Sequence, residues 1–472
     1  MRSWNMNVLL LMGGAMVLSG CATTVTFDVN TTQDLHDTIV NDLQCLAEGT
    51  DNLCSLRAAV EQANAFTPGT AHIIINVPTG IYSLSAEPED HLTLNSGRFV
   101  EIRGAGASNT IIQPASGVFS RAFFILGGLF RFSNLTVRNA KTNDTTGGGI
   151  LVDAANFYGE INNCIIEDNS SIFQGGGIYA KGSEGSSLLL SDTMIRNNEA
   201  GFGGAGGGGG LYAQVGFLAL RHVTISGNGG GNGAGALLFT QEVEILDSAI
   251  IGNNGSVNAG GQAIPGQGAG LELDSGTVFI GRSTISGNQA GDHGGGIYVG
   301  GDASLSLRDV TISNNDVFGA AGAGGVEWAG LGPTITIQNS ILAGNRRQNF
   351  TASDCHPSVT SHGFNFIGSD LNCTIDNQNN DQIGTEDVPL DAQLGALDFN
   401  GGPTENHLPL SDSPVIDAGS GCDNVDQRGR PRPRDGNGND VAGCDIGAVE
   451  WQPGVDPVGG EVGSVGVDRG RP

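Results

Sequence analysis

The stretch from Ile280 to Tyr298, IGRSTISGNQAGDHGGGIY, contains one complete unit of the pattern that decides the fold. Two apolar residues, Ile280 and Ile285, stand five positions apart, and Asn288 follows three positions later. Three glycines then precede the pair Ile297-Tyr298. Short apolar segments separated by turn residues, none of them long enough for a helix, indicate short β-strands joined by bends.

The frame of two apolar residues and an asparagine occurs seven times, with 25 to 35 residues between successive asparagines. A glycine-rich segment leading into another strand follows each copy except the last. Repeats that align at this length predict a solenoid in which each coil stacks on the next. Stacked asparagines can form a ladder in which each amide bonds the next coil, about 4.8 Å away. The ladder positions are Asn169, Asn198, Asn228, Asn253, Asn288, Asn315 and Asn345.

These paired elements, over residues about 100–350, resemble those of polymorphic outer-membrane proteins and other pectin-lyase-like β-helices. The resemblance implies an all-β protein, a right-handed single-stranded parallel β-helix. It says much less about function, because one fold hosts many activities.

The N-terminal end carries a segment that we expect to cap the solenoid. Residues 54–64 have an apolar stripe at helical spacing, with Ser55 as the N-cap, which predicts a short helix. The segment resembles the Cys-Ser-Leu-Arg-Glu-Ala motif of many exported β-helix proteins, with Ala58 in place of the glutamate. We interpret Arg57 as an ion-pair partner and not as a catalytic residue.

The C-terminal region resembles the choice-of-anchor Q domain of bacterial surface β-helix proteins. Four segments match it in order, namely Gly401–Thr404, Ser413–Gly419, Asp426–Arg432 and Cys444–Glu450. The resemblance implies a C-terminal domain that accompanies surface anchoring.

The first residues have the features of an export signal. Arg2 precedes an apolar run, Val8–Leu18, which is too short to span a bilayer. The run ends in Leu18-Ser19-Gly20-Cys21, which resembles the lipobox of bacterial lipoproteins. This resemblance implies that Cys21 is lipidated and anchors the chain in the cell envelope. Ala22, in place of aspartate, implies the outer membrane or the cell surface.

The balance of charge limits the partners. The chain has 49 acidic and 21 basic residues, a formal net charge of −28. Such a surface repels phosphate backbones, so we expect no nucleic-acid partner. We expect contact with a membrane through the lipid, and with an extracellular glycan or protein.

Apart from Cys21, the cysteines form three close pairs and one single residue. An oxidising compartment favours disulfides, each worth about 2–4 kcal/mol, between Cys45 and Cys54, Cys355 and Cys373, and Cys422 and Cys444. Cys164 occupies an inward position of the repeat, and we expect it to be a buried thiol.

These observations divide the chain into six parts. They are a signal peptide (1–20), a tether after the lipidated cysteine (21–44), an N-terminal cap with the first coils (45–110), the β-helix repeats (111–350), the C-terminal choice-of-anchor Q-like domain (351–452) and a flexible tail (453–472).

One column of polar residues could carry chemistry. The residue two positions after each frame start is expected to face solvent at a bend, which places Asp192, His222, Asp247, Arg282 and Asp309 in line. If the protein is an enzyme, these are the catalytic candidates, because two coils separate carboxylates by about 9–10 Å, near the spacing of inverting glycosidases. Their alternating charges fit a structural ladder better, and the coils lack the motifs of polygalacturonases and pectate lyases.

A calcium loop is a second candidate site, and calcium is the one cofactor that the sequence suggests. Asp435, Asn437, Asn439 and Asp440, with Asp445 behind them, place oxygen ligands at alternating positions. The segment departs from an EF-hand, which would have glycine where Asp440 stands. A turn rich in glycine and asparagine is the alternative.

The sequence therefore favours a non-catalytic, lipid-anchored surface protein that makes adhesive, envelope or glycan contacts. The alternative is a polysaccharide lyase or glycoside hydrolase on the same fold.

Replacing Cys21 tests the lipid anchor. Cys21→Ser removes the thiol that would carry the lipid, so we expect the variant to leave the membrane fraction for the soluble one. Fractionation with immunodetection measures this, and a variant that stays with membranes as firmly as the wild type contradicts the lipobox assignment.

Overall fold

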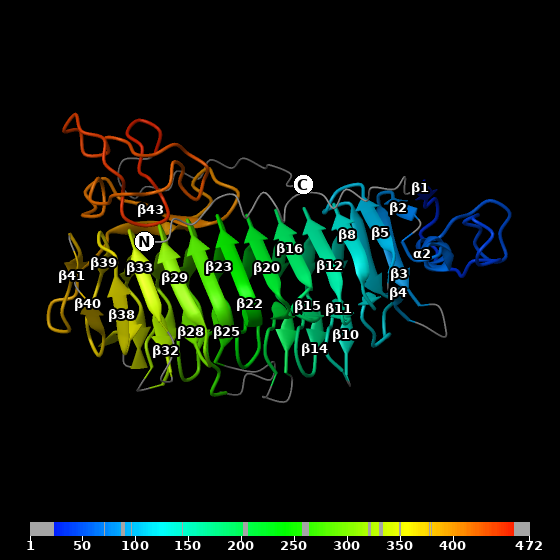
Figure 1. The fold of residues 1–472 in the computed structure, drawn as a ribbon, viewed down its shortest axis with the longest axis horizontal. Helices are drawn as coiled ribbons and strands as arrows, with labels where there is room; N and C mark the ends of the chain where they lie inside the picture. Colours follow the sequence, from blue (N-terminus) through cyan, green and yellow to red (C-terminus); the bar gives the residue numbers. More distant parts are fainter. Residues whose placement is uncertain are drawn as a thin grey trace.

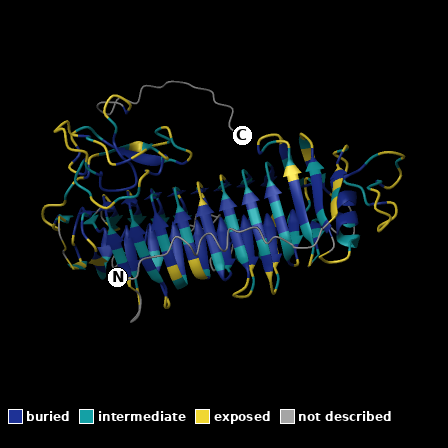
Figure 2. Cartoon of the chain, turned by 45° about the horizontal axis from the view of Figure 1, so that its top comes forward, coloured by how far each residue is buried: buried dark blue, intermediate teal, exposed yellow. Residues whose placement is uncertain are grey.

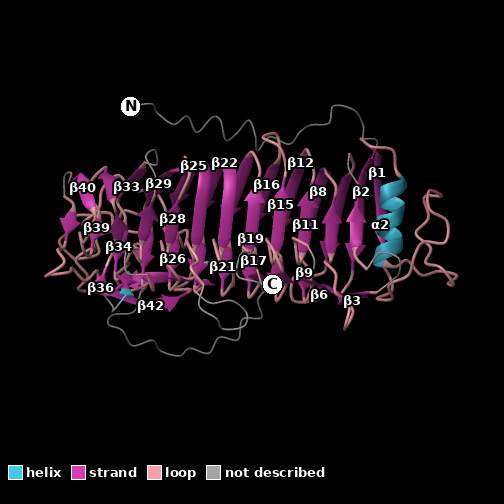
Figure 3. Cartoon of the chain, turned by 90° about the horizontal axis from the view of Figure 1, so that it is seen from below, coloured by secondary structure: helices cyan, strands magenta, loops and turns pink. Residues whose placement is uncertain are grey.

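The structure, a computed structural model, describes residues 23–456 except 70, 86–89, 96, 144, 202–205, 257–263, 320–321, 330–333, 349–350, 377 and 379. The export signal with Cys21, and residues 457–472 of the tail, lie outside the described residues. The chain forms a rod of stacked coils with the helix α2 (Leu56–Ala65) at its N-terminal end (Figures 1 and 3). This right-handed parallel β-helix confirms the expected fold class.

Each coil contributes up to four short strands, and equivalent strands stack in parallel columns. The first column holds the strands that follow the glycine segments: β4 (Leu92–Leu94), β7 (Phe123–Ile125), β11 (Ile150–Asp153), β15 (Ile178–Lys181), β19 (Leu211–Gln214), the first parts of β22 (Ala236–Leu246) and β25 (Leu271–Gly281), β28 (Ile297–Val299), β32 (Val326–Trp328) and β37 (Cys355–His356).

The second column contains the longest stack: β1 (Thr23–Asp28), β2 (Ala71–Val77), β5 (Phe99–Gly104), β8 (Gly128–Ser133), β12 (Phe157–Asn162), β16 (Ser187–Ser191), β20 (Phe217–Arg221), the second parts of β22 and β25, β29 (Ser304–Arg308), β33 (Ile335–Gln338), β38 (Ser358–Ser361) and β40 (Thr374–Asp376).

The third column follows a sharp corner: β3 (Gly80–Leu84), β6 (Thr110–Pro114), β9 (Thr136–Arg138), β13 (Ile165–Glu167), β17 (Met194–Arg196), β21 (Thr224–Ser226), β23 (Ala249–Ile251), β26 (Thr284–Ser286), β30 (Thr311–Ser313), β34 (Ile341–Ala343), β39 (Phe366–Ile367) and β41 (Gln382–Ile383). Two-residue strands complete the coils: β10 (Lys141–Thr142), β14 (Ser170–Ser171), β18 (Glu199–Ala200), β24 (Asn254–Gly255), β27 (Gln289–Ala290), β31 (Asp316–Val317), β35 (Arg346–Arg347) and, antiparallel to it, β36 (Thr351–Ala352). A hairpin of β42 (Leu394–Asp398) and β43 (Asn406–Pro409) lies beyond the coils.

The frame residues form the core. Because the strands pair in register, Ile195 stacks between Ile166 and Ile225, and all three are fully buried. One apolar cluster runs from Phe27 to Ile367, and Figure 2 shows it as buried strands along the rod. Burial of this continuous surface is the main stabilising contribution.

The asparagine ladder forms along this core. The backbone N and the Nδ2 of Asn228 donate to Oδ1 of Asn253 at 3.0 and 2.9 Å, and Nδ2 also donates to the carbonyl of Ile195 in the preceding coil at 3.0 Å. Each amide therefore ties its own coil to the coils before and after it. The same bonds repeat from Asn169 to Asn345.

Asp354 ends the ladder. Its Oδ1 accepts the last pair of bonds, from the backbone N and the Nδ2 of Asn345, and its Oδ2 accepts from the backbone N of Ser369. A carboxylate suits this position because it accepts hydrogen bonds without bringing an NH2 group that would need a further acceptor.

The glycine segments are explained by contact with the ladder. A Cβ added to Gly210 would lie 3.0 Å from Cγ of Asn228 and 2.6 Å from the carbonyl oxygen of Gly235. The neighbouring coil and the stacked amide leave no room for a side chain. The glycines that precede Ile178, Leu211 and Ile297 are therefore part of the ladder itself.

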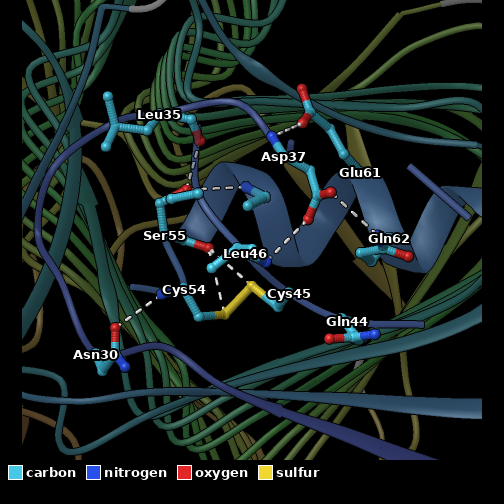
Figure 4. Close-up of a disulfide and its surroundings, with 12 residues drawn as sticks. Asn30, Leu35, Asp37, Gln44, Cys45, Leu46, Cys54, Ser55, Glu61 and Gln62 are labelled. Carbon is cyan, nitrogen blue, oxygen red and sulfur yellow. Dashed lines mark hydrogen bonds between the residues drawn. A yellow bond between two sulfur atoms is a disulfide. The ribbon is translucent and has the colours of Figure 1, made fainter. Parts of the chain in front are cut away.

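The N-terminal cap closes the first coils. Ser55 Oγ accepts from the backbone N of Ala58, and Arg57 forms a buried ion pair with Asp34, as expected. The Cys45–Cys54 disulfide holds the adjoining loop, where Asn30 Oδ1 accepts from the backbone N of Cys54 (Figure 4). The disulfides Cys355–Cys373 and Cys422–Cys444 also form, and burial raises the pKa of the free thiol of Cys164 to about 12.

Three of the expected boundaries are wrong. Residues 23–28 are not a tether, because β1 pairs with β2 and buries Phe27. Coils continue past residue 350 as far as β41, where a different side chain, Asp354, replaces the ladder asparagine. The first residues of the expected tail also pack, since buried Asp456 pairs with Arg428.

The C-terminal segment folds back along the rod. Figure 1 shows it, in orange and red, lying over one long edge of the later coils. Thr404 bonds the carbonyl of Asp247, Gln427 accepts from Thr284, and the backbone N of Ala448 donates to Thr311. No helix within the described residues is long and apolar enough to cross a membrane.

A substitution in the ladder tests this architecture. Asn228→Leu leaves two buried N–H donors of Asn198 without an acceptor, so we expect the free energy of unfolding to fall by about 2–6 kcal/mol, at about 1–3 kcal/mol for each donor. His222→Asn is the control, because His222 is exposed and asparagine tolerates its positive φ of 52°. Equal and small effects in thermal and denaturant unfolding would contradict the ladder.

Candidate functional site

The catalytic candidates from the sequence form a structural corner. Asp192, His222, Asp247, Arg282 and Asp309 all have φ between 44° and 56°, the left-handed conformation that turns the chain from the second column into the third. Nδ1 of His222 lies 3.2 Å from Oδ1 of Asp192, and Nε and Nη2 of Arg282 donate to the two carboxylate oxygens of Asp247. The alternating charges therefore pair between adjacent coils, which the ladder interpretation predicts.

The expectation that this whole column faces solvent is wrong. Asp309 is fully buried, and its Oδ1 lies 2.8 Å from Nη2 of Arg432, which belongs to the C-terminal segment. Arg282 likewise pairs with Asp423. The C-terminal segment, more than 100 residues away in the sequence, packs over the coils that contain Arg282 and Asp309. Asp192 and His222 lie in earlier coils and are exposed.

The segment of the candidate calcium loop forms a turn held by hydrogen bonds within it. The carboxylate of Asp435 accepts hydrogen bonds from the backbone N atoms of Gly438, Asn439 and Asp440, and thus closes the loop on itself. Asn437 and Asn439 likewise accept backbone N–H bonds within the loop. Asp445 is buried, with its oxygens bonded to the backbone N of Asp417 and Trp451. Within the described ranges, no three His, Cys, Asp or Glu side chains group as metal ligands.

A different column brings together titratable side chains. The second residue of each first-column strand alternates with the core residues and therefore points outward. Along the rod this column begins apolar and aromatic, with Tyr179 stacked on Tyr212 at 4.6 Å between ring centroids. Further along the rod, the column contains acidic and basic side chains. In register, the column is Leu151, Tyr179, Tyr212, Leu237, Glu272, Tyr298, Glu327 and His356.

Glu272 is a buried carboxyl group, and the described residues place no cation beside it. It is 5% exposed, its Oε1 accepts only a long 3.4 Å bond from Nδ2 of Asn232, and its Oε2 has no hydrogen-bond partner among the described residues. Burial, followed by repulsion from Asp274, raises the pKa of Glu272 to about 8. At neutral pH this carboxyl group therefore holds a proton that it can donate.

Glu327 and His293 form a bonded pair beside it. Oε1 of Glu327 lies 2.8 Å from Nδ1 of His293, and Oε2 accepts from the backbone N of Gly294 and Ala323. The other ring nitrogen of His293 lies 3.3 Å from Asp292. Each ring nitrogen of His293 thus has a carboxylate partner, which fixes the orientation of the imidazole and of Asp292.

Tyr298 lies between the two glutamates in the stack. Its ring centroid is 6.0 Å from that of His293. Burial and the carboxylates of Glu327, Glu272, Asp274 and Asp292, in this order of effect, raise the pKa of Tyr298. We define these residues, Glu272, Asp274, Asp292, His293, Tyr298 and Glu327, as the outer acid site.

Glu101 shows what a purely structural buried glutamate looks like in this protein. It is 4% exposed, and it bonds Arg103 and His72, with Arg131 nearby. Although burial alone would raise it, these partners lower the pKa of Glu101. Glu272 has the same burial and none of this compensation, which distinguishes it from the ion pairs of the scaffold.

The sequence contains a signal for the outer acid site, at a position outside the frame of two apolar residues and an asparagine. Tyr179, Tyr212 and Tyr298 recur at one position after the glycine segments, a pattern that suggests packing. Glu272 and Glu327 occupy the same position in two other coils. A charged residue at a position that leucine or tyrosine holds in other coils is therefore the local sign of the outer acid site in the sequence.

The pH dependence of stability tests the state of Glu272. Because the pKa of Glu272 is about 8 in the folded chain and about 4.5 in the unfolded chain, its contribution to stability is complete below about pH 4.5 and is lost as the pH rises through about 8. Glu272→Gln cannot ionise, so we expect its melting temperature to exceed that of the wild type increasingly over this interval. Glu242→Gln, at an exposed position of β22, is the control, and parallel curves for all three proteins would contradict the assignment.

Comparison with known proteins supports the fold. No family model and no curated protein matches the chain. The crystal structure of pectate lyase Pel9A is similar with a TM-score of 0.54 and 16% identity, over 90% of this chain and 97% of that one. The A-module of mannuronan C-5 epimerase AlgE4 from Azotobacter vinelandii has a TM-score of 0.47 and 15% identity, over 71% and 91%. At these identities the likeness establishes a pectate-lyase-like right-handed parallel β-helix and no activity.

Proposed function

We propose that this chain is a carbohydrate-active enzyme that cleaves glycosidic bonds at the outer acid site. The observation that carries the proposal is Glu272, a buried carboxyl group with an unbonded oxygen and no cation beside it. Such a group costs stability, and groups of this kind are concentrated where catalysis needs them. The likeness in fold to a pectate lyase makes a glycan a reasonable substrate, by analogy only.

The residues divide the chemistry between them. Glu272, protonated at neutral pH, would donate its proton to the oxygen that leaves. Asp292, oriented by the His293–Glu327 pair, would accept a proton from water. Two coils separate Glu272 from Glu327, about 10 Å along the rod.

The location of the enzyme remains the expectation from the sequence. A lipid on Cys21 would hold the rod at the envelope, where extracellular glycans are within reach. The alternative, a non-catalytic surface rod that only contacts glycans or proteins, predicts no turnover at all.

Activity measurements separate these possibilities. We expect the purified full-length chain to release reducing ends from at least one member of a panel of neutral, amino-sugar and uronate polysaccharides. Glu272→Gln should lower the rate by about 100-fold or more, since general acids contribute about 10²–10⁴-fold. His293→Gln should also lower it.

Two control variants test whether a loss of activity is specific to the outer acid site. Glu242→Gln removes an exposed carboxylate from a neighbouring strand, and Asp192→Asn alters the exposed part of the corner column. Both should keep full activity. Cleavage that is abolished by Asp192→Asn but survives Glu272→Gln would move the active site to the corner, and an inert wild type would favour the non-catalytic rod.

A further inference from the structure

The outer acid site has an excess of negative groups. Four carboxyl groups, those of Glu327, Glu272, Asp274 and Asp292, lie close enough to Tyr298 to raise its pKa, and that of Asp302 raises the pKa of Asp274. Among the described residues, the nearby side chains that can become cationic are the half-buried His293 and His356.

The coils that form the site contain almost no fixed positive charge. From residue 222 to residue 345 the sequence has two basic residues, Arg282 and Arg308, and no lysine. Both arginines pair with Asp423 at the corner that the C-terminal segment covers. The residues of this span that the structure does not describe, 257–263, 320–321 and 330–333, also contain no lysine or arginine in the sequence.

This charge distribution decides which glycans can bind. A uronate chain would bring a carboxylate on every sugar against the carboxyl groups of the site, and like charges within a few ångströms repel. An ammonium group would instead supply a cation for the carboxylate of Asp274, with charge-assisted hydrogen bonds, while Glu272 keeps the proton that it donates. The chain as a whole adds to this preference, with a formal net charge of −28.

We infer that the outer acid site takes a glycan built from amino sugars whose amino groups are free and positively charged. The inference rests on the proposed function, because it names the substrate of the same site. It also sets the reaction type. Elimination needs a ring proton made acidic by a neighbouring carboxylate, and an amino sugar has no such carboxylate.

The reaction is therefore hydrolysis. The bond between the anomeric carbon and the glycosidic oxygen breaks, and the proton of Glu272 passes to that oxygen. A water oxygen bonds to the anomeric carbon, and the proton that it loses passes to the carboxylate of Asp292, which His293 orients. One water is consumed for each bond cleaved, and proton exchange with solvent restores both residues.

Three matched oligosaccharides test the inference with the full-length chain at about pH 6. They are a glucosamine hexamer, its fully N-acetylated counterpart, which has the same skeleton without the charge, and a galacturonate hexamer with and without calcium. Calorimetry measures binding and mass spectrometry measures products. We expect the glucosamine hexamer to bind about tenfold or more tightly than the acetylated one, and its affinity to fall between about 0.05 and 0.5 M salt. We expect no binding of the galacturonate hexamer.

Variants place the binding at this site. Asp274→Asn should weaken the glucosamine hexamer by about tenfold and leave the acetylated one unchanged, and Glu242→Gln should alter neither. Equal affinity for the charged and acetylated hexamers, tighter binding of galacturonate with or without calcium, or no binding of any of the three would overturn the inference.

The two proposals fail in different ways. If the glucosamine hexamer binds, is sensitive to Asp274→Asn and is never cleaved, the proposed activity is wrong while the ligand class stands. If Glu272-dependent cleavage occurs on a neutral or uronate glycan alone, the activity stands and the ligand class is wrong.

Discussion

The stacked asparagine amide is the interaction on which the rest of the structure depends. Each ladder amide bonds the coil before and the coil after it, and it packs against a glycine that can carry no side chain. These bonds are buried, so each coil must repeat the same backbone path or leave donors unsatisfied. The apolar frame then stacks by consequence, and the longest insertions lie at the corner after the asparagine. The coils repeat regularly along the ladder, and the coils after Asp354 have no ladder asparagine that continues it.

This dependence explains how much of the fold could be predicted from the sequence. The ladder, the inward residues and the glycine segments repeat locally, so the pattern Ile-x-x-Asn was enough to predict the coils. The ends could not be predicted in this way. Coils after Asn345 use other side chains, and β1 precedes the first frame copy. The burial of Asp309 depends on Arg432, which reaches it through the fold of a distant segment. No local pattern reports such a contact.

Side chains in the outward columns take no part in the asparagine ladder or the stacked apolar frame, so the residue at these positions differs from coil to coil. One outward column is a corner of paired charges, which is compensated and structural. The other begins with stacked tyrosines and continues to Glu272, beside which the described residues place no cation, and to Glu327, which pairs with His293. Glu101 shows that this protein can surround a buried glutamate with cations where only stability matters. Asp354 is also buried with no cation beside it among the described residues, and burial raises its pKa to about 7, but hydrogen bonds from Asn345 and Ser369 occupy both of its oxygens. The unbonded oxygen of Glu272 therefore distinguishes it from the carboxyl groups of the scaffold, and the sequence shows this difference only once the register is known.

The pKa of Glu272 is the quantity on which this account depends most. Carbon-13 labelling of glutamate side chains allows each carboxyl group to be titrated by NMR, and Glu272→Gln identifies the resonance by its loss. The account predicts a carboxyl group that titrates near pH 8, with a midpoint that falls when a cationic sugar binds. A midpoint near 4.5, the ordinary value, would mean that Glu272 is solvated or paired in solution. That result would contradict the outer acid site as the place where this rod does chemistry.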